Sequence, residues 1–405
     1  MAAHMSIEEQ YDTYPYPARN PKDERKRLIQ GSPSFPVEMD HYLFGGKRNW
    51  REPIRILVAG GGTGDALVQL AQVLTSAKRP YEITYVDLSV TAREIAEARI
   101  AERRLQNVTF HTGSLLDAPE YGMFDYIDCC GVLHHLPEPD KGFKALSEAL
   151  APQGGMGLMV YAPYGRNGVY PLQEGFNALS QGMSAKERLA FGKATLRNLP
   201  KAHPFKTNPV LVDHKKSDAG FYDLLLHSQD RPYTVSELAG ALDRAGLQSA
   251  GFLPRALYQL DDLLPAGMDV PEGLSEIDRM AAAEKLRGTI KTHIVYAVHK
   301  GREDLKAIDP TDPWLVPHLK SGAGPQLAKM IERKGKILMD FQTESYEWKI
   351  PRECAPLLAL IDGRTPLGVL RERVGLDEFV FRGQWRRVHD ALEPWNELNY
   401  SKLYV

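Results

Sequence analysis

The chain has 405 residues, of which 43% are hydrophobic and 25% charged, as in an ordinary globular protein. Its formal net charge of -2 argues against a chain-wide basic surface, so we expect no nucleic-acid partner. Its three cysteines, Cys129, Cys130 and Cys354, give neither a disulfide framework nor a thiolate zinc site. No apolar run approaches the roughly 18 residues of a membrane span, so we expect a cytoplasmic protein without membrane contact.

The first 50 residues are rich in tyrosine and proline, as in "YDTYPYPARNP" (11–21), and lead to "HYLFGG" (41–46). Prolines fix an extended chain at low entropy cost, and tyrosines offer amphipathic faces. The pattern predicts that residues 6–50 form a lid with a short helix, an extended stretch and a second helix. An N-terminal arm packed on the core is the alternative.

Strand and helix patterns alternate from residue 54 to residue 163. Strands are expected at 54–60, 81–89, 108–114 and 154–163, a further strand running into a loop at 124–136, and helices at 64–77, 91–104 and 140–150. This alternation predicts an α/β fold with a doubly wound, mostly parallel sheet. Residues 249–260 and 292–300 are expected to complete the sheet as a hairpin.

The remaining segments divide the chain into further units. The domain expected at 51–300 contains a helical cap insertion at 165–231, above the edge of the sheet where ligands bind. A linker is predicted at 301–323. Residues 324–405 are predicted to form a small α+β accessory domain.

The run "LVAGGGTGD" (57–65) places a glycine loop between the first strand and its helix. Such loops let backbone N–H groups approach a ligand closely. A Walker loop is excluded because Asp65 stands where Lys is needed, and the GxGxxG fingerprint fails because Asp65 also takes its third glycine position. The spacing of Gly60, Gly62 and Gly64 resembles the S-adenosylmethionine (SAM) loop of class I methyltransferases.

Further segments carry the same resemblance in the same order. Asp87 ends the second strand, Ser114 and Leu115 follow the third, and "FDYIDCCGVLHHLPEPDKGFKALSEALAPQGGMGLMVY" (124–161) is similar to the family's fourth and fifth strand segments. The resemblance covers residues 51–163 and 232–300. It implies a Rossmann-like methyltransferase with SAM as cofactor and S-adenosylhomocysteine as product. The cofactor-binding residues that it implies are Tyr16, Gly60, Gly62, Gly64, Asp65, Asp87, Leu88, Ser114, Leu115 and Gly131.

Two positions depart from the family pattern. An acidic residue usually precedes the first glycine by two positions, where this chain has Val58, and another acid usually follows the third strand, where it has Ser114. Asp65, Asp87 or Asp117 is expected to take over the polar contacts.

The acceptor side is predicted from residues after the fourth and fifth strands. His134, His135 and Tyr161 are the catalytic candidates, with a histidine as the base that takes the acceptor's proton; a structural histidine is the alternative. The predicted substrate-binding residues are Tyr164, Arg166, Tyr170 and His227. Tyrosine faces can hold a cation, although packing of the cap would also explain them. Asp223 and His227, four residues apart, are interpreted as a pair on one helix face, and no metal is expected.

Two looser resemblances concern the ends of the chain. The N-terminal segment is similar to that of bacterial methyltransferases with a substrate-regulating extension, among them lysine methyltransferases of outer-membrane proteins. This implies that Tyr11, Tyr14 and Tyr16 close the SAM site. The segment "YEWKIPRECAPLLALIDGRTPLGVLRERVG" (346–375) resembles a peptide-binding winged-helix domain. A stabilising domain, or one that forms a homodimer, is the alternative.

These observations predict a SAM-dependent methyltransferase that modifies a protein or peptide side chain, with an amine as the expected acceptor. A small-molecule O-, N- or S-methyltransferase with an enclosed acceptor pocket is the first alternative. A SAM-binding regulator without catalysis is the second.

Overall fold

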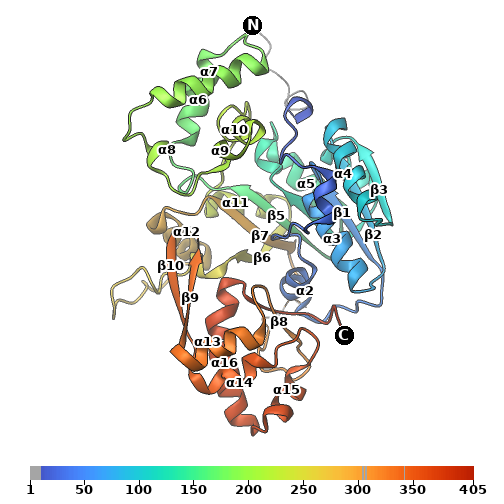
Figure 1. The fold of residues 1–405 in the computed structure, drawn as a ribbon, viewed down its shortest axis with the longest axis vertical. Helices are drawn as coiled ribbons and strands as arrows, with labels where there is room; N and C mark the ends of the chain where they lie inside the picture. Colours follow the sequence, from blue (N-terminus) through green and yellow to red (C-terminus); the bar gives the residue numbers. More distant parts are fainter. Residues whose placement is uncertain (1–10, 303–304, 306–307, 342) are drawn as a thin grey trace.

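The computed structural model describes residues 11–302, 305, 308–341 and 343–405. Residues 6–10 of the expected lid and 303–304 and 306–307 of the expected linker lie outside this description. A central sheet occupies the middle of the molecule (Figure 1). A helical segment coloured green lies at one end of it, and the orange and red C-terminal part lies at the other.

The central sheet has seven strands, in the order β3-β2-β1-β4-β5-β7-β6. They are β1 (Ile54–Ala59), β2 (Tyr81–Asp87), β3 (Val108–Thr112), β4 (Phe124–Cys130), β5 (Leu150–Tyr161), β6 (Leu247–Leu253) and β7 (Thr292–His299). The first five are parallel, and β7 is antiparallel to both of its neighbours. The predicted doubly wound sheet is confirmed, although β6 and β7 are joined by a long connection that contains a helix instead of a tight hairpin turn.

Helices cover both faces of this sheet. One face packs against α2 (Pro36–Phe44), α3 (Asp65–Ser76) and α4 (Val90–Glu102), and the other against α5 (Pro139–Ala149), α11 (Val235–Arg244) and α12 (Glu276–Arg287). Because both faces are covered, β1 is almost continuously buried and apolar. Short 3₁₀ helices lie at Pro21–Arg25, Leu115–Tyr121, Leu133–His135, Arg255–Tyr258, Arg352–Cys354 and Glu393–Trp395.

The insertion at 165–231 is helical, as the sequence predicts. It contains α6 (Val169–Leu179), α7 (Ala185–Asn198), α8 (Pro204–Thr207), α9 (Asp213–Lys216) and α10 (Asp218–Leu225). These helices share an apolar cluster around Phe176 and Phe221. Tyr14 from the N-terminal segment stacks on Tyr222 of α10, with ring centroids 5.0 Å apart. The insertion and the N-terminal segment therefore meet.

The C-terminal part has a core of its own around the buried Trp385. It contains β8 (Pro317–Leu319), α13 (Gly324–Lys334), β9 (Lys336–Phe341), β10 (Glu344–Lys349), α14 (Ala355–Ala359), α15 (Leu367–Val374), α16 (Glu378–Leu392) and β11 (Leu398–Tyr400). Strand β8 pairs with β11, and Leu315 is buried in the same core. Part of the expected linker 301–323 thus belongs to this unit, and the resemblance to a winged-helix domain stays a prediction.

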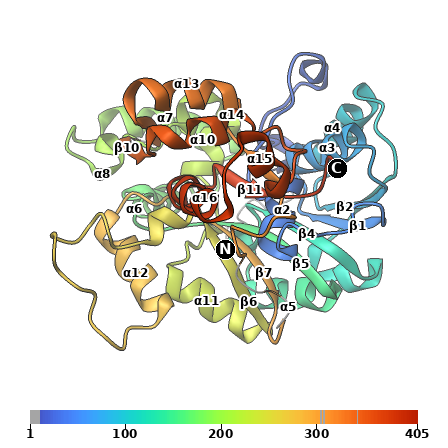
Figure 2. The ribbon, with the colours of Figure 1, turned by 90° about the horizontal axis from the view of Figure 1, so that it is seen from below.

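Helix α2 joins the C-terminal part to the sheet and does not form part of a lid. Asp40 accepts hydrogen bonds from Trp50 Nε1 at 2.8 Å and from Ser401 Oγ at 2.6 Å, and Glu38 accepts one from Lys320 Nζ at 2.7 Å. Viewed from below, α2 and β11 lie together (Figure 2). The lid prediction for 6–50 is therefore restricted to the residues before α2, because Lys320 and Ser401, which bind α2, lie 282 and 361 positions from their partners.

No helix in the part of the chain that the structure describes combines the length and the apolar character needed to cross a membrane.

A second contact between the C-terminal part and the rest of the molecule involves the carboxylate of Glu393. Glu393 accepts a hydrogen bond from Arg255 Nη2 at 2.5 Å, and its carboxylate lies 3.6 Å from His41 Nε2. Burial alone raises the pKa of Glu393, but His41, Arg255 and His389 together lower that pKa to about 2.

Replacing Glu393 by Gln should therefore destabilise the protein in a pH-dependent way. A carboxylate with a lowered pKa stabilises the fold above its usual pKa of about 4.5 and loses this effect as the pH falls toward 2. We expect E393Q to lower the free energy of unfolding by roughly 2 kcal/mol at pH 7 and by clearly less at pH 3.5, as measured by urea unfolding. Equal losses at both pH values would show that charge is not the cause.

Candidate active site

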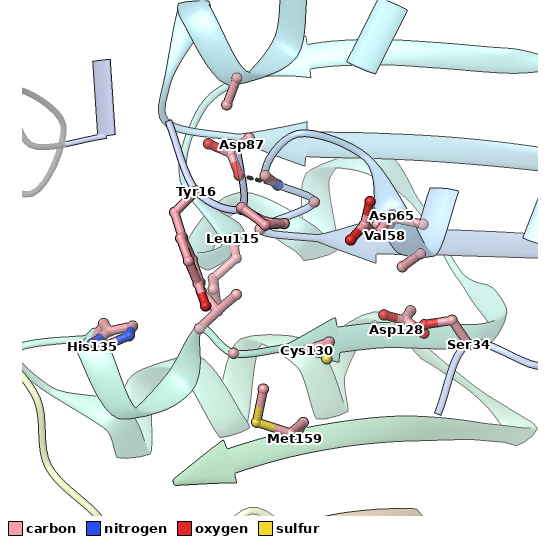
Figure 3. Close-up of a pocket in the computed structure, with 18 of the residues that line it drawn as sticks. Tyr16, Ser34, Val58, Asp65, Asp87, Leu115, Asp128, Cys130, His135 and Met159 are labelled. Atoms are coloured by element: carbon pink, nitrogen blue, oxygen red, sulfur yellow. Dashed lines mark hydrogen bonds between the residues drawn. The ribbon is translucent and has the colours of Figure 1, made fainter. Parts of the chain in front are cut away.

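A cavity of about 370 Å³ lies at the carboxyl ends of the central strands (Figure 3). Its walls come from the glycine loop after β1, the ends of β2, β4 and β5, the N-terminal segment and α10. This is the edge where open α/β sheets bind their ligands. The sequence analysis places the site at this same edge.

Most of the predicted site residues line this cavity. They are Tyr16, Gly60, Gly62, Asp65, Asp87, Leu88, Ser114, Leu115, Gly131, His135 and Tyr161. The predicted residues that do not line it are Gly64, His134, Tyr164, Arg166, Tyr170 and His227. Lining residues that the sequence did not point to include Ser34, Gln69, Asp128, Cys130, Met159 and Asp223.

The glycines of the loop serve different purposes. Gly60 has a φ of +70°, and a Cβ there would lie 2.4 Å from the side chain of Val132. Gly64 has a φ of +95° at the start of α3, and its Cβ would lie 2.9 Å from that of Ala96 on α4. Only a residue without a side chain fits these left-handed, crowded positions. Gly64 thus packs two helices together, whereas Gly62 opens on the cavity.

The N-terminal segment is fastened to this loop. Thr63 Oγ1 donates a hydrogen bond to the Pro17 carbonyl at 2.7 Å. Arg19 binds both oxygens of Asp65, at 2.8 and 2.6 Å, and Arg99 Nη1 donates to the same carboxylate at 2.7 Å. Burial alone raises the pKa of Asp65, but the two guanidinium groups bring it below its usual value. Asp65 therefore anchors the segment over the cavity.

Asp87 is held by backbone amides at the end of β2. Its carboxylate accepts hydrogen bonds from the Gly62 N–H at 2.7 Å and from the Ser89 N–H at 2.9 Å. Burial raises the pKa of Asp87, and these donors oppose the rise. A carboxylate has about four acceptor sites, so lone pairs remain on Asp87 for a ligand's hydroxyl groups.

The two adjacent histidines differ in their surroundings. His135 Nδ1 lies 2.8 Å from the Gln229 carbonyl, so this nitrogen carries the proton and Nε2 keeps its lone pair. Both ring nitrogens of His134 are buried without a hydrogen-bond partner among the described residues. The His134 ring packs on Tyr161, with centroids 4.1 Å apart. Of the two adjacent histidines, His135 lines the cavity and His134 does not.

A buried carboxylate, that of Asp223, lies close to the His135 ring. The hydroxyl groups of Tyr11 and Tyr161 each donate a hydrogen bond to Asp223, both at 3.2 Å. Burial raises the pKa of Asp223. The predicted helical pair of Asp223 with His227 is wrong, because α10 ends at Leu225 and His227 contacts Tyr11, with Nε2 3.2 Å from its hydroxyl.

Arg166 supports Tyr161 from behind. Its guanidinium lies 3.6 Å from the centre of the Tyr161 ring, and it donates hydrogen bonds to Tyr170 at 3.0 Å and to Asp230 at 3.2 Å. Direct substrate binding by Arg166, Tyr170 or Tyr164 stays a prediction.

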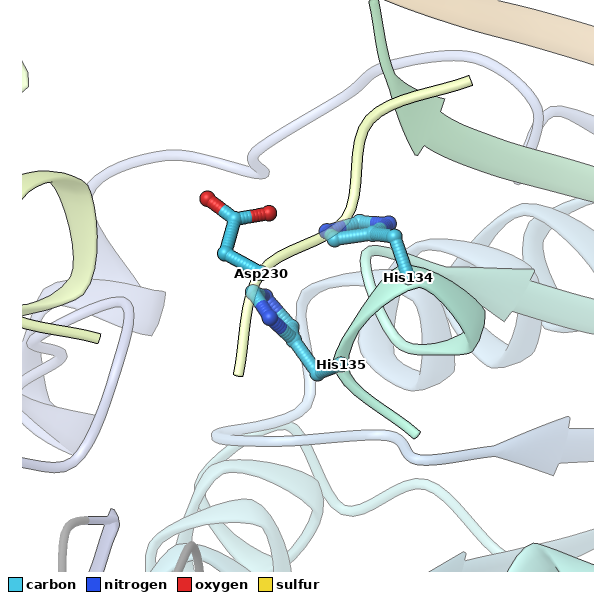
Figure 4. A group of neighbouring side chains, drawn as sticks. All are labelled: His134, His135 and Asp230. Carbon is cyan, nitrogen blue, oxygen red and sulfur yellow. The ribbon is translucent and has the colours of Figure 1, made fainter. Parts of the chain in front are cut away.

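Two groups of side chains near the cavity have the composition of a metal site. Donor atoms of His134, His135 and Asp230 lie within 4.8 Å of one another (Figure 4), as do those of His135, Asp223 and His227. Asp230 already pairs with the Arg166 guanidinium, whose charge opposes a cation.

In the second group, the ring nitrogens of His227 already take part in hydrogen bonds. His227 Nδ1 accepts from the Gln229 N–H at 3.1 Å, so its proton is on Nε2 and blocks that nitrogen as a ligand. We therefore assign no metal ion to either group.

Comparisons with known proteins identify the family. A methyltransferase domain model matches residues 57–156. An uncharacterised protein of Synechococcus sp. is 31% identical over 321 residues, which cover 76% of this chain and 74% of that protein. The chain belongs to the class I SAM-dependent methyltransferases.

Solved structures agree with this assignment at the level of the fold. PKMT2 from Rickettsia typhi, solved with S-adenosylhomocysteine, superimposes on the methyltransferase with a TM-score of 0.63 over 91% of this chain and 76% of that one, at 16% identity. Magnesium-protoporphyrin O-methyltransferase of Rhodobacter capsulatus is 34% identical over 88 residues, which are 22% of this chain and 36% of that protein. The methyltransferase uses SAM as its cofactor.

The residues of the cavity fit this cofactor. SAM supplies a methyl group on a positively charged sulfonium. Asp87 has free lone pairs for the ribose hydroxyls, and the ring of Tyr16 provides an aromatic face for the positive sulfur. Burial raises the pKa of the Cys130 thiol, which therefore stays neutral and does not compete as a nucleophile.

Removing the Arg19 side chain should weaken cofactor retention, because the N-terminal segment would lose its ion pair with Asp65. We expect R19A to bind S-adenosylhomocysteine roughly tenfold more weakly by isothermal titration calorimetry. The matched control is Arg51→Ala, an exposed arginine outside the cavity lining. Unchanged affinity in R19A would contradict the lid model.

Proposed function

We propose that the methyltransferase transfers the methyl group to an amine nitrogen of a protein or peptide side chain. The observation that carries this proposal is the chemistry around Asp223. This carboxylate is 5% exposed, lines the cavity and receives its hydrogen bonds from two neutral tyrosine hydroxyls. A buried carboxylate with neutral donors favours a cationic ligand.

The aromatic residues around this carboxylate add to the preference. Tyr11, Tyr16 and Tyr161 line the same cavity as Asp223. Tyrosine faces attract ammonium groups by about 0.5–2 kcal/mol, and more strongly where water is excluded. A slender alkylammonium group, such as that of a lysine side chain, matches a carboxylate surrounded by tyrosine rings.

The reaction then requires loss of one proton from the ammonium group. One ring nitrogen of His135 and one oxygen of Asp223 lie within 4.8 Å of each other, so an ammonium group bound at Asp223 lies beside the His135 ring. His135 takes the proton, and the freed nitrogen lone pair attacks the methyl carbon. The carbon–sulfur bond breaks, and its electron pair stays on sulfur. Proton removal by a positioned base contributes about 10²–10⁴-fold.

The macromolecular acceptor is supported by resemblance at both ends of the chain. The N-terminal segment is similar to that of methyltransferases acting on outer-membrane proteins, and the C-terminal part to a peptide-binding domain. A cytoplasmic location and a homodimer stay proposals.

A small-molecule amine is the second candidate. The observation that favours it is the enclosure of the acceptor end, where Tyr11 of the N-terminal segment closes on Asp223 and His227.

Methyl-label transfer from SAM separates the two candidates. Incubated with a bacterial lysate, the methyltransferase should place label in protein or peptide, on a nitrogen that resists base hydrolysis. Label confined to the small-molecule fraction would overturn the macromolecular acceptor and support the second candidate. Base-labile label would indicate an ester and contradict the amine.

Substitution of His135 tests the proposed base. We expect H135Q to lower kcat by at least 10²-fold while S-adenosylhomocysteine binding changes little, because the ring acts on the acceptor. His299→Gln, at the opposite end of the sheet, is the matched control. A kcat within threefold of the wild type in H135Q would remove His135 from the mechanism.

A further inference from the structure

An acidic residue interrupts the apolar strand β4 and faces the cofactor cavity. Asp128 is 1% exposed and lines the cavity, and Figure 3 shows its carboxylate directed toward Ser34. The parallel register places Asp128 beside Val58 of β1. Adjacent strands lie about 4.8 Å apart, so an acid at either position reaches the same part of the cavity wall.

Asp128 has no positively charged partner among the described residues. Its carboxylate accepts hydrogen bonds from the side chain of Ser34 and from the Tyr126 hydroxyl, the latter at 3.3 Å. Burial is the main cause that raises the pKa of Asp128, to about 6, and Ser34 and Tyr126 only partly oppose it. A buried carboxylate of this kind is costly unless a cation binds to it.

Gln69 lines the same cavity, and within the described part of the chain one of its side-chain atoms is an unpaired hydrogen-bond donor. Gln69 of α3 is 3% exposed, and its Oε1 accepts a hydrogen bond from the Gly31 N–H at 2.8 Å. This bond fixes the amide orientation. The Nε2 of Gln69 has no hydrogen-bond partner among the described residues. A free buried amide donor favours an acceptor such as a carboxylate.

The two groups are complementary to one end of the cofactor. We propose that Asp128 and Gln69 form the binding site for the amino-acid end of SAM, with Asp128 receiving its α-ammonium group and Gln69 Nε2 donating to its α-carboxylate. The inference rests on SAM occupying this cavity and does not depend on the acceptor.

The position of Asp128 agrees with the branching of the cofactor. Three substituents leave the sulfonium: the adenosyl group, the amino-acid chain and the methyl group. Asp87 is assigned to the adenosyl group, and His135 to the side of the methyl group. In Figure 3, Asp128 lies away from both residues, on the far side of Cys130 from His135. The remaining part of the cavity, next to Ser34, is thus left for the amino-acid chain.

Binding of cofactor analogues tests the site without any acceptor. We would compare S-adenosylhomocysteine with its analogue that lacks the α-amino group, using isothermal titration calorimetry. The wild type should prefer the parent compound by roughly 10–100-fold, and D128N should lose most of this preference. An unchanged preference in D128N would overturn the proposal.

The strand register supplies a sharper control. In V58D/D128N the carboxylate moves to the neighbouring position on β1, and we expect the preference for the α-amino group to return at least in part. 5′-Methylthioadenosine lacks the amino-acid end, so its binding should be equal in wild type and D128N. Loss of its binding in D128N would contradict the assignment of Asp128, because that residue would then maintain the whole cavity and not one end of the cofactor.

Gln69→Leu removes the amide donor with little change in volume. Its preference for S-adenosylhomocysteine over the decarboxylated analogue should fall by roughly tenfold relative to the wild type. Retention of the full preference would overturn the assignment of Gln69, whatever the result for Asp128.

Discussion

The buried guanidinium of Arg99 determines how the N-terminal segment lies over the cofactor cavity. It donates hydrogen bonds to Glu24 at 2.7 Å, to the Thr63 carbonyl at 2.8 Å and to Asp65 at 2.7 Å. A fully buried charge must be neutralised and hydrogen-bonded, so these three elements are fixed relative to one another. Asp65 in turn binds Arg19. The glycine loop and its cover are therefore positioned by one network, on which the shape of the cavity depends.

The carboxylates around the cavity differ in the kind of group that donates hydrogen bonds to them. Asp65 is paired with two arginines, so its role is structural. Asp87 accepts hydrogen bonds from backbone amides and keeps lone pairs for the ribose hydroxyls. Asp128 and Asp223 receive only neutral hydroxyl donors among the hydrogen bonds described. Burial without a cation is unfavourable, which is why the last two are the positions where a positively charged group of a ligand is best stabilised.

The sequence allowed the sheet, the glycine loop and Asp87 to be predicted, because each depends on local periodicity or on a short motif. Asp128 escaped prediction because its meaning depends on the register between two strands about 70 positions apart. The sequence feature that could have indicated Asp128 is an acidic residue in the middle of a mostly buried strand. Helix α2 was misassigned for a similar reason, since Asp40 meets Ser401, 361 positions away. Gly64 fitted the motif, but its need for glycine comes from contact with Ala96.

The N-terminal segment contacts both ends of the proposed site, so the proposed function implies that cofactor and acceptor binding are coupled. Near the cofactor end, Asp12 accepts a hydrogen bond from Ser89 Oγ at 2.5 Å, directly after Asp87 and Leu88. At the acceptor end, Tyr11 donates to Asp223 and contacts His227. Displacing the segment would remove one of the two tyrosine donors of Asp223 and admit water to its carboxylate. Because water weakens both the cation–π and the ionic attraction, the acceptor site is complete only while the cofactor is covered.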